Sequence, residues 1–506
     1  MKAVRVVVVG AGMGGLAAAC DLARRGCEVT LCEAADAPGG KMRRVNGVDA
    51  GPTVFTMRWI FEGLFADAGR RIEDALDLVP AELLARHAWR SGGTLDLFAD
   101  VERSAEAIGA FAGPREAQGY RDFVARSGAM HRTLEGPYIA GQRPSPLDLV
   151  RRVGLSGLGA LWRTQPHRRL WSALGDHFAD PRLRQLFGRY ATYVGSSPFL
   201  APATLMLIAH VEQDGVWLVR GGIGQVARAM ADLARRQGAR LHFGAPVARI
   251  LVQDGRATGV RLRTGERILA DAVVFNGDAS ALGQGLLGEA ASVAASAVPR
   301  ARRGLSAITW CVRGRTGGFD LAHHNVFFAE DYAAEFRAIF RERGIVDAPT
   351  VYVCAQDRGE AAPPRVPGGP ERLLLLINAP ADGDVRDFSR DVLRHAADAR
   401  ALMAACGLAI EESASVATAP DGFDALFPGT GGALYGRANH GPMGSFARPG
   451  ARSRLPGLYL CGGSAHPGAG IPMATMSGRL AAARLLEDAA KARAPGLRLT
   501  PAPVAP

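Results

Sequence analysis

A glycine-rich stretch near the start of the chain has the residue types and spacing that bind a dinucleotide. Residues 10–15 are GAGMGG, which supplies the pattern G-x-G-x-x-G. In such a turn Gly10 permits a tight bend, Gly12 lets the backbone approach a pyrophosphate, and Gly15 lets the next helix pack closely on the preceding strand. Glu33 follows after roughly 20 residues, where a carboxylate can bind the ribose hydroxyls of an adenosine. The spacing predicts an adenine-dinucleotide site.

A second glycine-rich loop lies near the other end of the chain. Residues 462–473 are GGSAHPGAGIPM, and they stand between a short apolar strand over 458–461 and a helix over 474–489. A loop of this kind exposes unpaired backbone N–H groups and the positive end of a helix dipole. These groups can hold the pyrimidine edge of a flavin and stabilise the negative charge of its reduced form. An NAD enzyme needs no second site, whereas FAD extends between two, so we expect FAD.

The elements that must position these loops follow a Rossmann-type pattern. A β-branched run ending at Val9 is suited to a strand that is buried on both faces of a parallel sheet. Gly26 ends the helix that follows the first turn, and the second strand ends just before Glu33. The expected elements are a strand over 4–9, a helix over 17–25, a strand over 27–32, a helix over 225–236, one strand over 238–250, a hairpin strand over 257–262 and a returning strand over 267–275.

The first stretch also fits a secretory signal, because Lys2 and Arg5 precede an apolar run that ends in Ala-Ala-Ala-Cys. A signal peptide seldom contains several glycines in its apolar region, and the residues after Cys20 have the pattern of a folded domain. The seven cysteines are scattered and form no CxxC pair, which is typical of a reducing compartment. We therefore expect a cytoplasmic protein in which Cys20 is a small buried residue on the first helix.

Composition narrows the class of protein. The chain has 506 residues and 48% hydrophobic content, enough to bury a large core in two or more domains. Its net charge of +11 comes mostly from arginine, and no aromatic-basic module is present, so we expect no nucleic-acid partner. Apolar runs such as residues 373–377 are far shorter than the roughly 20 residues that span a bilayer. A basic surface can instead face anionic lipid.

Two further stretches resemble the flavin-containing amine oxidases and carotenoid desaturases. Residues 37–44 (APGGKMRR) are similar to a P-G-G-[RK] turn of that family, and residues 49–53 (DAGPT) to a D-x-G-P-T stretch that passes close to the flavin. The resemblance implies that Lys41 and Arg43 lie near the pyrophosphate or the flavin. The alternative is that both are ordinary cations on a surface loop. It also implies that the backbone of Val247 contacts the adenine, where an ordinary core valine is the alternative.

The nucleotide pattern and the resemblance together give a set of expected FAD-binding residues. Many relatives place an acid beside the last glycines, whereas this chain has Gly463 and Ser464, so backbone amides or the Ser464 hydroxyl must bind the ribityl group here. The expected residues are Gly10, Gly12, Met13, Gly14, Gly15, Glu33, Gly40, Lys41, Gly51, Pro52, Thr53, Val247, Gly463, Ser464, Ile471, Pro472 and Met473.

Longer stretches resemble the phytoene-type carotenoid desaturases over most of the chain. HPGAGIP at 466–472 and VWLVRGGIG at 216–224 carry this likeness. Residues 55–62, 188–204 and 433–446 are similar to the branch that desaturates 1-hydroxy- and 1-methoxycarotenoids at the 3,4 bond, the hydroxyneurosporene and methoxyneurosporene desaturases. The resemblance implies an acyclic carotenoid with a tertiary hydroxyl or methoxyl at one end. It also implies hydride transfer to flavin N5, followed by loss of a proton from the adjacent carbon.

The resemblance implies an α/β fold with a Rossmann-type FAD-binding domain, amine-oxidase/GDI-like, and an inserted α+β substrate domain. The expected FAD-binding domain is discontinuous and comprises residues 1–75, 215–285 and 450–492. The expected substrate and membrane-facing domain comprises residues 76–214 and 286–449, and residues 493–506 form a loose tail rich in Pro and Ala.

No Ser-His-Asp or metal-ligand constellation is present in the sequence, so we expect flavin chemistry without a metal. The cation that hydride loss leaves on a polyene is strongly acidic, which makes a dedicated base optional. If a base exists, His466 is the nearest candidate, with Asp49 and His440 behind it. The alternative for His466 is a turn residue that hydrogen-bonds the loop backbone.

An elongated apolar tunnel is the implied substrate site. Phe55, Trp59, Tyr193 and Trp217 are the main tunnel candidates, because they fall in stretches that resemble the family. Tyr190, Phe199 and Tyr435 are further candidates on the same ground. An ordinary core position is the alternative for each of them.

Arginine, tryptophan and leucine recur at helix-like spacing in residues 149–153, 161–163 and 167–171. This pattern favours a segment at a membrane interface, while a solvated basic helix packed on the core is the alternative. Because a carotenoid is insoluble, we expect peripheral association with the inner or photosynthetic membrane. Quinone or O2 is the expected electron acceptor.

Three alternatives to a 3,4-desaturase of 1-hydroxy- or 1-methoxycarotenoids stay open from the sequence alone. A general phytoene-type desaturase or a carotenoid isomerase would use the same cofactor. A prenyl-lipid carrier on the same scaffold would need no flavin site, and the full fingerprint with Glu33 argues against it. An amine oxidase is disfavoured, because residues 439–450 provide neither an aromatic cage nor a lysine.

Overall fold

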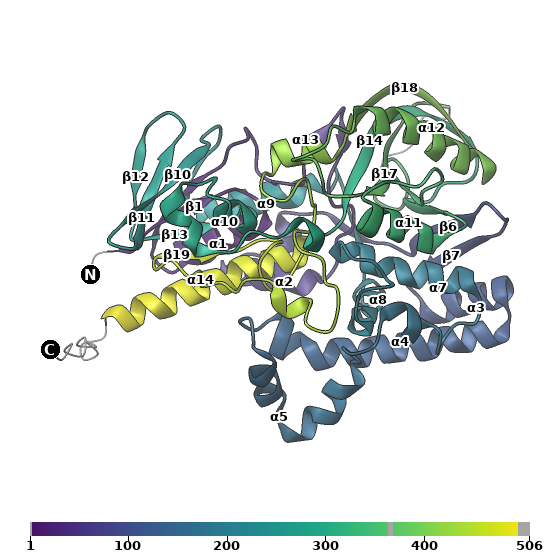
Figure 1. Ribbon diagram of the computed structural model, residues 1–506, viewed down its shortest axis with the longest axis horizontal. Coiled ribbons are helices and arrows are strands. Elements are labelled where there is room, and N and C mark those ends of the chain that lie inside the picture. The colour runs from purple at the N-terminus through teal and green to yellow at the C-terminus, as the bar shows by residue number, and fades with distance from the viewer. Residues whose placement is uncertain (1–2, 363–367, 494–506) are drawn as a thin grey trace.

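The computed structural model describes residues 3–362 and 368–493 (Figure 1). Its first layer is a five-stranded parallel sheet in the order β19-β13-β1-β2-β9. The strands come from three distant parts of the chain: β1 (Arg5–Val9), β2 (Glu28–Cys32), β9 (Arg240–His242), β13 (Ala272–Phe275) and β19 (Leu458–Leu460). Four consecutive valines of β1 are buried, as expected for a strand covered on both faces. The Rossmann-type sheet predicted from the sequence is therefore confirmed.

Three helices pack together beside this sheet, and α1 contacts both of the others. Gly14 and Gly478 lie where α1 and α14 meet, because a Cβ on Gly478 would stand 2.0 Å from the Gly14 carbonyl oxygen. Cys20 is buried in α1, as predicted. The three helices are α1 (Met13–Arg24), α9 (Gly224–Arg236) and α14 (Ile471–Arg493).

The prediction of a single strand over residues 238–250 is wrong. The chain leaves the parallel sheet after β9 and enters a separate antiparallel sheet at Val247. Gly244 between them has a φ of +62°, and Pro246 offers no backbone N–H, so the segment cannot continue one ladder. The separate sheet consists of β10 (Val247–Gln253), β11 (Arg256–Leu262) and β12 (Arg267–Leu269).

The second layer is a seven-stranded sheet that is antiparallel except where β6 pairs with β15. Helix α12 (Ser389–Ala405) covers part of it (Figure 1). Its strands, in sheet order, are β18 (Leu408–Thr418), β14 (Ser306–Gly318), β17 (Glu371–Ala379), β16 (Val351–Ala355), β15 (His324–Phe328), β6 (Leu83–Trp89) and β7 (Thr94–Phe98). Two short pairs complete the strands, β3 (Arg44–Val45) with β4 (Val48–Asp49) and β5 (Leu78–Pro80) with β8 (Trp217–Val219).

A helical part lies below this sheet in Figure 1. It comprises α3 (Val101–Ala112), α4 (Pro114–Leu134), α5 (Pro146–Arg163), α6 (Leu170–Leu174), α7 (Pro181–Gly188) and α8 (Leu207–Gln213), and α5 lies at the lower end of this part in Figure 1. The remaining helices are α2 (Arg58–Asp67), α10 (Ala279–Gly283), α11 (Tyr332–Arg337) and α13 (Pro420–Leu426). Within the described ranges, no helix has both the length and the apolar character to cross a membrane.

The expected tail over 493–506 falls outside the described residues apart from its first position.

Candidate active site

One cavity of about 1,200 Å3 joins the two glycine-rich loops and continues between the seven-stranded sheet and the helical part. All of the expected FAD-binding residues line this cavity except Gly15. Its lining includes Glu33 and Val247, the turns at Gly12 and Gly40, and the loop at Gly463. A single space therefore connects every segment that the sequence associates with FAD.

The backbone of the first turn requires glycine. Gly10 has a φ of +98°, a conformation that side chains rarely adopt, and a Cβ on Gly15 would stand 2.0 Å from the Gly10 carbonyl oxygen. Gly15 thus contributes from behind the cavity, by letting α1 start close to β1. The Glu33 carboxylate accepts hydrogen bonds from the backbone N–H groups of Ala11 at 2.5 Å and Ala35 at 2.9 Å. These bonds fix Glu33 at the cavity wall, a position that is compatible with the predicted ribose-binding carboxylate.

The two halves of the site touch at Gly14. A Cβ there would stand 2.8 Å from the backbone nitrogen of Gly462 and 2.9 Å from the carbonyl oxygen of Ala474. Gly12 caps α1 without a side-chain hydrogen bond, and the first turn of α1 has no acidic residue, so nothing there opposes a phosphate. The residues present therefore fit an extended dinucleotide cofactor such as FAD.

Three charged side chains surround the Gly463 loop. Lys41 donates a hydrogen bond to the carbonyl of Leu434, and burial lowers the pKa of its ammonium group. Asp278 caps α10 by accepting from the Ser280 N–H, and burial raises the pKa of its carboxyl group. Arg448 is 1% exposed and donates to the Gly463 carbonyl at 2.7 Å. Lys41 could be predicted from its glycine-rich turn, whereas no sequence motif marks Asp278 or Arg448.

Two neighbours of these residues have local partners. The Ser464 hydroxyl accepts from the Ala279 N–H at 3.1 Å and lies 3.4 Å from the Gly277 carbonyl, while Ser464 still lines the cavity. Arg43 donates to the Thr418 hydroxyl at 3.0 Å and is not part of the cavity wall, unlike the neighbouring Lys41. The structure therefore places Lys41, and not Arg43, at the cofactor cavity.

His466 lies behind the cavity wall, although Pro467 next to it lines the cavity. Its Nε2 is 2.9 Å from the Gly141 carbonyl oxygen, and its ring packs edge-on against Tyr138 at 4.8 Å between centroids. Burial lowers the pKa of His466 to about 4, so the ring is neutral at pH 7. The other two candidates for a catalytic base also have hydrogen-bond partners in the backbone: Asp49 accepts from the Ile223 N–H, and His440 accepts from the Ser197 N–H.

We expect the substitution His466→Gln to retain most of the desaturation rate, within about threefold, because a glutamine amide can also donate to the Gly141 carbonyl. The measurement is the initial rate of chromophore lengthening at matched FAD content. A loss of activity greater than about a hundredfold at full FAD content, in the range typical of a lost acid–base catalyst, would restore the catalytic role.

The structure separates the aromatic tunnel candidates into two groups. Tyr193 and Tyr435 line the cavity. Phe55 packs against Phe61 at 4.7 Å between ring centroids and is fully buried. The candidates that do not line the cavity are Phe55, Trp59, Tyr190, Phe199 and Trp217. These five side chains pack in the protein core or against it. Neighbouring residues of the same stretches, such as Val54 and Val216, line the cavity in their place.

Polar side chains from separate elements also line the apolar part of the cavity. The Tyr352 hydroxyl is 2.7 Å from the Thr53 hydroxyl and 2.7 Å from His324 Nδ1. Arg189 lies with its guanidinium carbon 5.1 Å from the centre of the Tyr352 ring. Arg189, His324 and Tyr352 could not be predicted as site residues, since they belong to no recognisable motif.

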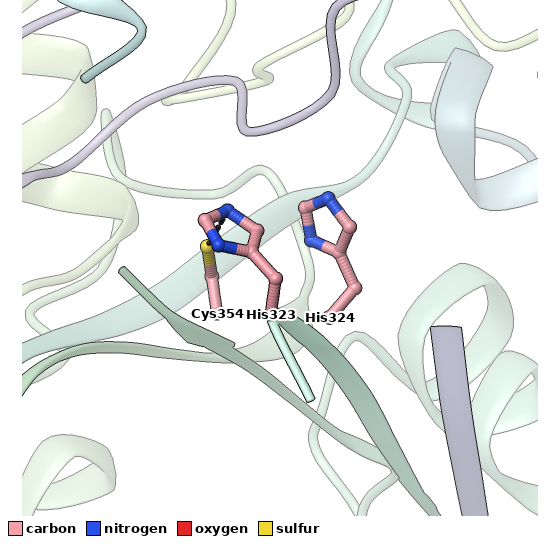
Figure 2. A group of neighbouring side chains, drawn as sticks. All are labelled: His323, His324 and Cys354. Atoms are coloured by element: carbon pink, nitrogen blue, oxygen red, sulfur yellow. Dashed lines mark hydrogen bonds between the residues drawn. The ribbon is translucent and has the colours of Figure 1, made fainter. Parts of the chain in front are cut away.

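Figure 2 shows His324 beside His323 and Cys354, three residues whose ligand atoms lie within 4.8 Å of one another. His323 Nε2 is 3.5 Å from the Cys354 sulfur, and His323 Nδ1 is 2.8 Å from the Arg358 carbonyl oxygen. Burial raises the pKa of the Cys354 thiol to about 12, which opposes the thiolate that a metal requires. Hydrogen bonds thus account for His323 and Cys354, and of the three only His324 lines the cavity.

Helix α5 connects the cavity to the protein surface. Leu149, Val150 and Leu161 line the cavity, while Leu155 is 88% exposed and Trp162 is 69% exposed on the same helix. A helix with apolar side chains on both its inner and outer faces cannot bury all of them against the protein.

Comparisons with known proteins agree with this geometry. Residues 13–486 match the family of flavin containing amine oxidoreductases. The chain is 55% identical over 490 residues to a hydroxyneurosporene desaturase of Rubrivivax gelatinosus, covering 95% of this chain and 93% of that protein. It is 46% identical to the hydroxyneurosporene desaturase of Cereibacter sphaeroides, covering 96% and 98%. It is 33% identical to a zeta-carotene-forming phytoene desaturase of Myxococcus xanthus, covering 98% and 96%.

Solved structures share the fold at low sequence identity. An oxidoreductase from Methanosarcina mazei superimposes with a TM-score of 0.59 at 15% identity, covering 96% of this chain and all of that one. Putrescine oxidase bound to putrescine gives the same TM-score and identity, covering 96% and 99%. The predicted Rossmann-type, amine-oxidase-like fold is confirmed by these neighbours and by the sheet described above.

Proposed function

The chain belongs to the flavin-containing amine oxidoreductase family, and we propose that it desaturates an acyclic 1-hydroxy- or 1-methoxycarotenoid at the 3,4 bond. It is an FAD-dependent carotenoid desaturase, since it aligns over nearly its whole length with relatives that are carotenoid desaturases. One observation carries the proposal: the cavity that joins the two glycine-rich loops also extends, with mostly apolar lining, to helix α5. The isomerase and the lipid carrier are not favoured by these relatives.

The residues that would hold FAD are those of the two loops and of the turn at Lys41. We propose that Glu33 and Val247 hold the adenosine, that the start of α1 holds the pyrophosphate, and that the loop before α14 holds the flavin. FAD, when bound, accepts a hydride from the allylic carbon of the substrate. The expected domains follow the same division, with residues 1–75, 215–285 and 450–492 around FAD and the remainder around the substrate.

The protein contributes to catalysis mainly by orientation and by exclusion of water. Side chains of β17 and the helical part, such as Leu374, Leu376 and Ile208, form an apolar wall that can hold a rigid polyene edge-on to the flavin. Such a wall also keeps water away from the cation that hydride loss leaves on the polyene. The proton is then lost from the adjacent carbon, a step for which the cation itself provides the driving force.

The experiment that tests the function is incubation of the purified holoenzyme with liposomes containing single carotenoids. Hydroxyneurosporene is expected to gain a double bond, seen as a shift of its absorbance to longer wavelength. Neurosporene, which lacks the hydroxyl, is expected to react much more slowly. Equal rates with both would contradict the narrow assignment and leave the carotenoid desaturase assignment in place.

We also propose that α5 docks on the membrane from which the substrate is taken. Leu147, Leu155, Leu158 and Trp162 expose apolar surface on this helix, and Arg151 beside them is 69% exposed. Apolar side chains with neighbouring arginines suit the interface of an anionic bilayer. This position would bring the tunnel mouth to the lipid, where a membrane quinone or dissolved O2 could reach the reduced enzyme.

Replacing Leu155 and Trp162 by serine is expected to weaken binding to anionic liposomes by about tenfold or more, because each side chain loses a large apolar area that lipid would cover. Flotation of the holoenzyme measures the bound fraction. The matched control is Leu393→Ser on α12, which removes a leucine that is 76% exposed elsewhere on the surface. If the double variant floats as well as the control, α5 is not the docking segment.

A further inference from the structure

The apolar part of the cavity contains polar side chains for which a hydrocarbon chain has no use. Arg189, Tyr193, His324 and Tyr352 lie together there, and we call them the end-group cluster. We propose that Arg189 and His324 of this cluster bind the oxygen atom at the end of the carotenoid and thereby select hydroxylated or methoxylated substrates. This inference rests on the proposed function, since it assigns the residues that recognise its end group.

Arg189 brings a positive charge into the cavity, and its direct contacts there are tyrosines and not a carboxylate. Its Nη1 is 3.2 Å from the Tyr193 hydroxyl, and its guanidinium lies against the rings of Tyr193 and Tyr352 at 5.3 Å and 5.1 Å. Among the described residues, no carboxylate lies within ion-pair distance of Arg189. Glu212, which also lines the cavity, accepts a hydrogen bond from the Tyr190 hydroxyl and interacts with the Arg189 charge at longer range. A guanidinium held by tyrosines therefore retains N–H groups that can donate to a ligand.

His324 has one ring nitrogen engaged and one free. Nδ1 is 2.7 Å from the Tyr352 hydroxyl, whereas the buried Nε2 has no hydrogen-bond partner. Burial lowers the pKa of His324 well below its ordinary value, so the ring is neutral and Nε2 can donate or accept. In Figure 2 no hydrogen bond joins His324 to His323 or Cys354, although His323 and Cys354 are joined to each other. A buried polar atom without a partner costs free energy, which a polar ligand would recover.

The end-group cluster lies where the substrate's oxygen must be. Tyr352 is in contact with Thr53, which belongs to the stretch proposed to lie against the flavin. In a 1-hydroxycarotenoid the C3–C4 bond follows the oxygen-bearing carbon after a single intervening carbon. The oxygen must therefore sit close to the flavin when this bond reacts, and the rest of the polyene must extend away through the apolar tunnel toward α5.

The chemistry of the end-group cluster also fits both possible end groups. A methoxyl oxygen only accepts hydrogen bonds, and a hydroxyl oxygen accepts as well as donates. Arg189 donates in either case, and neutral His324 donates when its proton is on Nε2 and the Tyr352 hydroxyl donates to Nδ1. A carotenoid that ends in hydrocarbon would leave both groups unpaired in the cavity, and such a site rejects the analogue lacking the oxygen.

The test compares the kcat/KM of the holoenzyme for hydroxyneurosporene with that for neurosporene in liposomes. In Arg189→Met and His324→Phe, the ratio of the two values is expected to fall by about tenfold or more, with the value for neurosporene kept or raised. The matched control is His323→Phe, which makes the same change at the neighbouring position that does not line the cavity, and the ratio should stay at the wild-type value.

Each outcome decides between the two assignments. If the wild type prefers the hydroxylated substrate and the variants keep that preference, or lose both activities in parallel at full FAD content, the end-group cluster does not recognise the oxygen, while the proposed function stands. If the wild type has no preference, the proposed function itself fails, and the end-group assignment fails with it. Arg189→Lys and Tyr352→Phe keep the bulk of each side chain and should lose part of the preference. They serve the same comparison if the larger changes lower the FAD content.

Discussion

The substitution Gly14→Ala is expected to lower the affinity for FAD by about tenfold or more, even though alanine is the better helix former. The added Cβ would stand 2.8 Å from the Gly462 nitrogen, 2.9 Å from the Ala474 oxygen and 2.6 Å from the Asn276 amide oxygen. Two of these atoms belong to backbone, which cannot turn away as a flexible side chain can. Overpacking of this kind costs about 1–3 kcal/mol, more than the helix propensity gained.

The expected loss is specific to the cofactor, because Gly14 is where the first turn meets the loop before α14. Equilibrium titration of the apoprotein with FAD, followed by flavin fluorescence, measures the affinity. Gly109→Ala on α3 is the matched control, since its Cβ would make only ordinary contact with Ala117 at 3.4 Å. An unchanged dissociation constant in Gly14→Ala would show that the two halves of the site are not held as closely as the structure has them.

The substitution Arg448→Met is expected to lower the free energy of unfolding by about 3 kcal/mol. The guanidinium donates to the carbonyls of Gly463 at 2.7 Å, Tyr435 at 2.9 Å and Arg437 at 2.9 Å, and Arg448 is 1% exposed. Methionine fills similar space but donates nothing, so these carbonyls would lose this donor. Burial lowers the pKa of Arg448, and relief from that desolvation offsets part of the loss.

Urea unfolding of the holoenzyme measures this effect. The control is Arg452→Met, where an arginine that is 57% exposed pairs with Asp488 at the surface, and there the change should be within about 1 kcal/mol. A midpoint for Arg448→Met no lower than that of the control would mean that the carbonyls find other donors. Because Tyr435 and Gly463 both line the cavity, we also expect Arg448→Met to release FAD more readily.

Local chemistry explains why the cofactor half of the protein could be predicted. The glycine turn at 10–15 depends on backbone angles and close approaches within a few residues, and β1, β2 and α1 have unbroken periodicities. Glu33 was predictable because its distance from the turn is set by one strand–helix–strand unit. The segment over 238–250 was not predicted correctly, since its apolar pattern runs on through Gly244 and Pro246, where the chain changes sheet.

The substrate half could be predicted only in outline. Of the main candidates, Tyr193 lines the cavity and Phe55, Trp59 and Trp217 do not; of the further candidates, only Tyr435 does. An aromatic residue in a core and one in a tunnel wall are both largely buried, so both occur in the same apolar sequence pattern. The sequence alone therefore cannot tell the two positions apart.

The sequence by itself determined the FAD-binding fold and most of the residues proposed to hold the cofactor, because strand, turn and helix signals act over short distances. Only the tertiary structure brought Arg189, His324 and Tyr352 to one end of an apolar tunnel. They come from a short helix and two neighbouring strands of the seven-stranded sheet, and strand pairing between distant segments sets which of their side chains face one another. It also decided that His466 lies behind the cavity wall, because its position depends on Gly141, far away in the sequence.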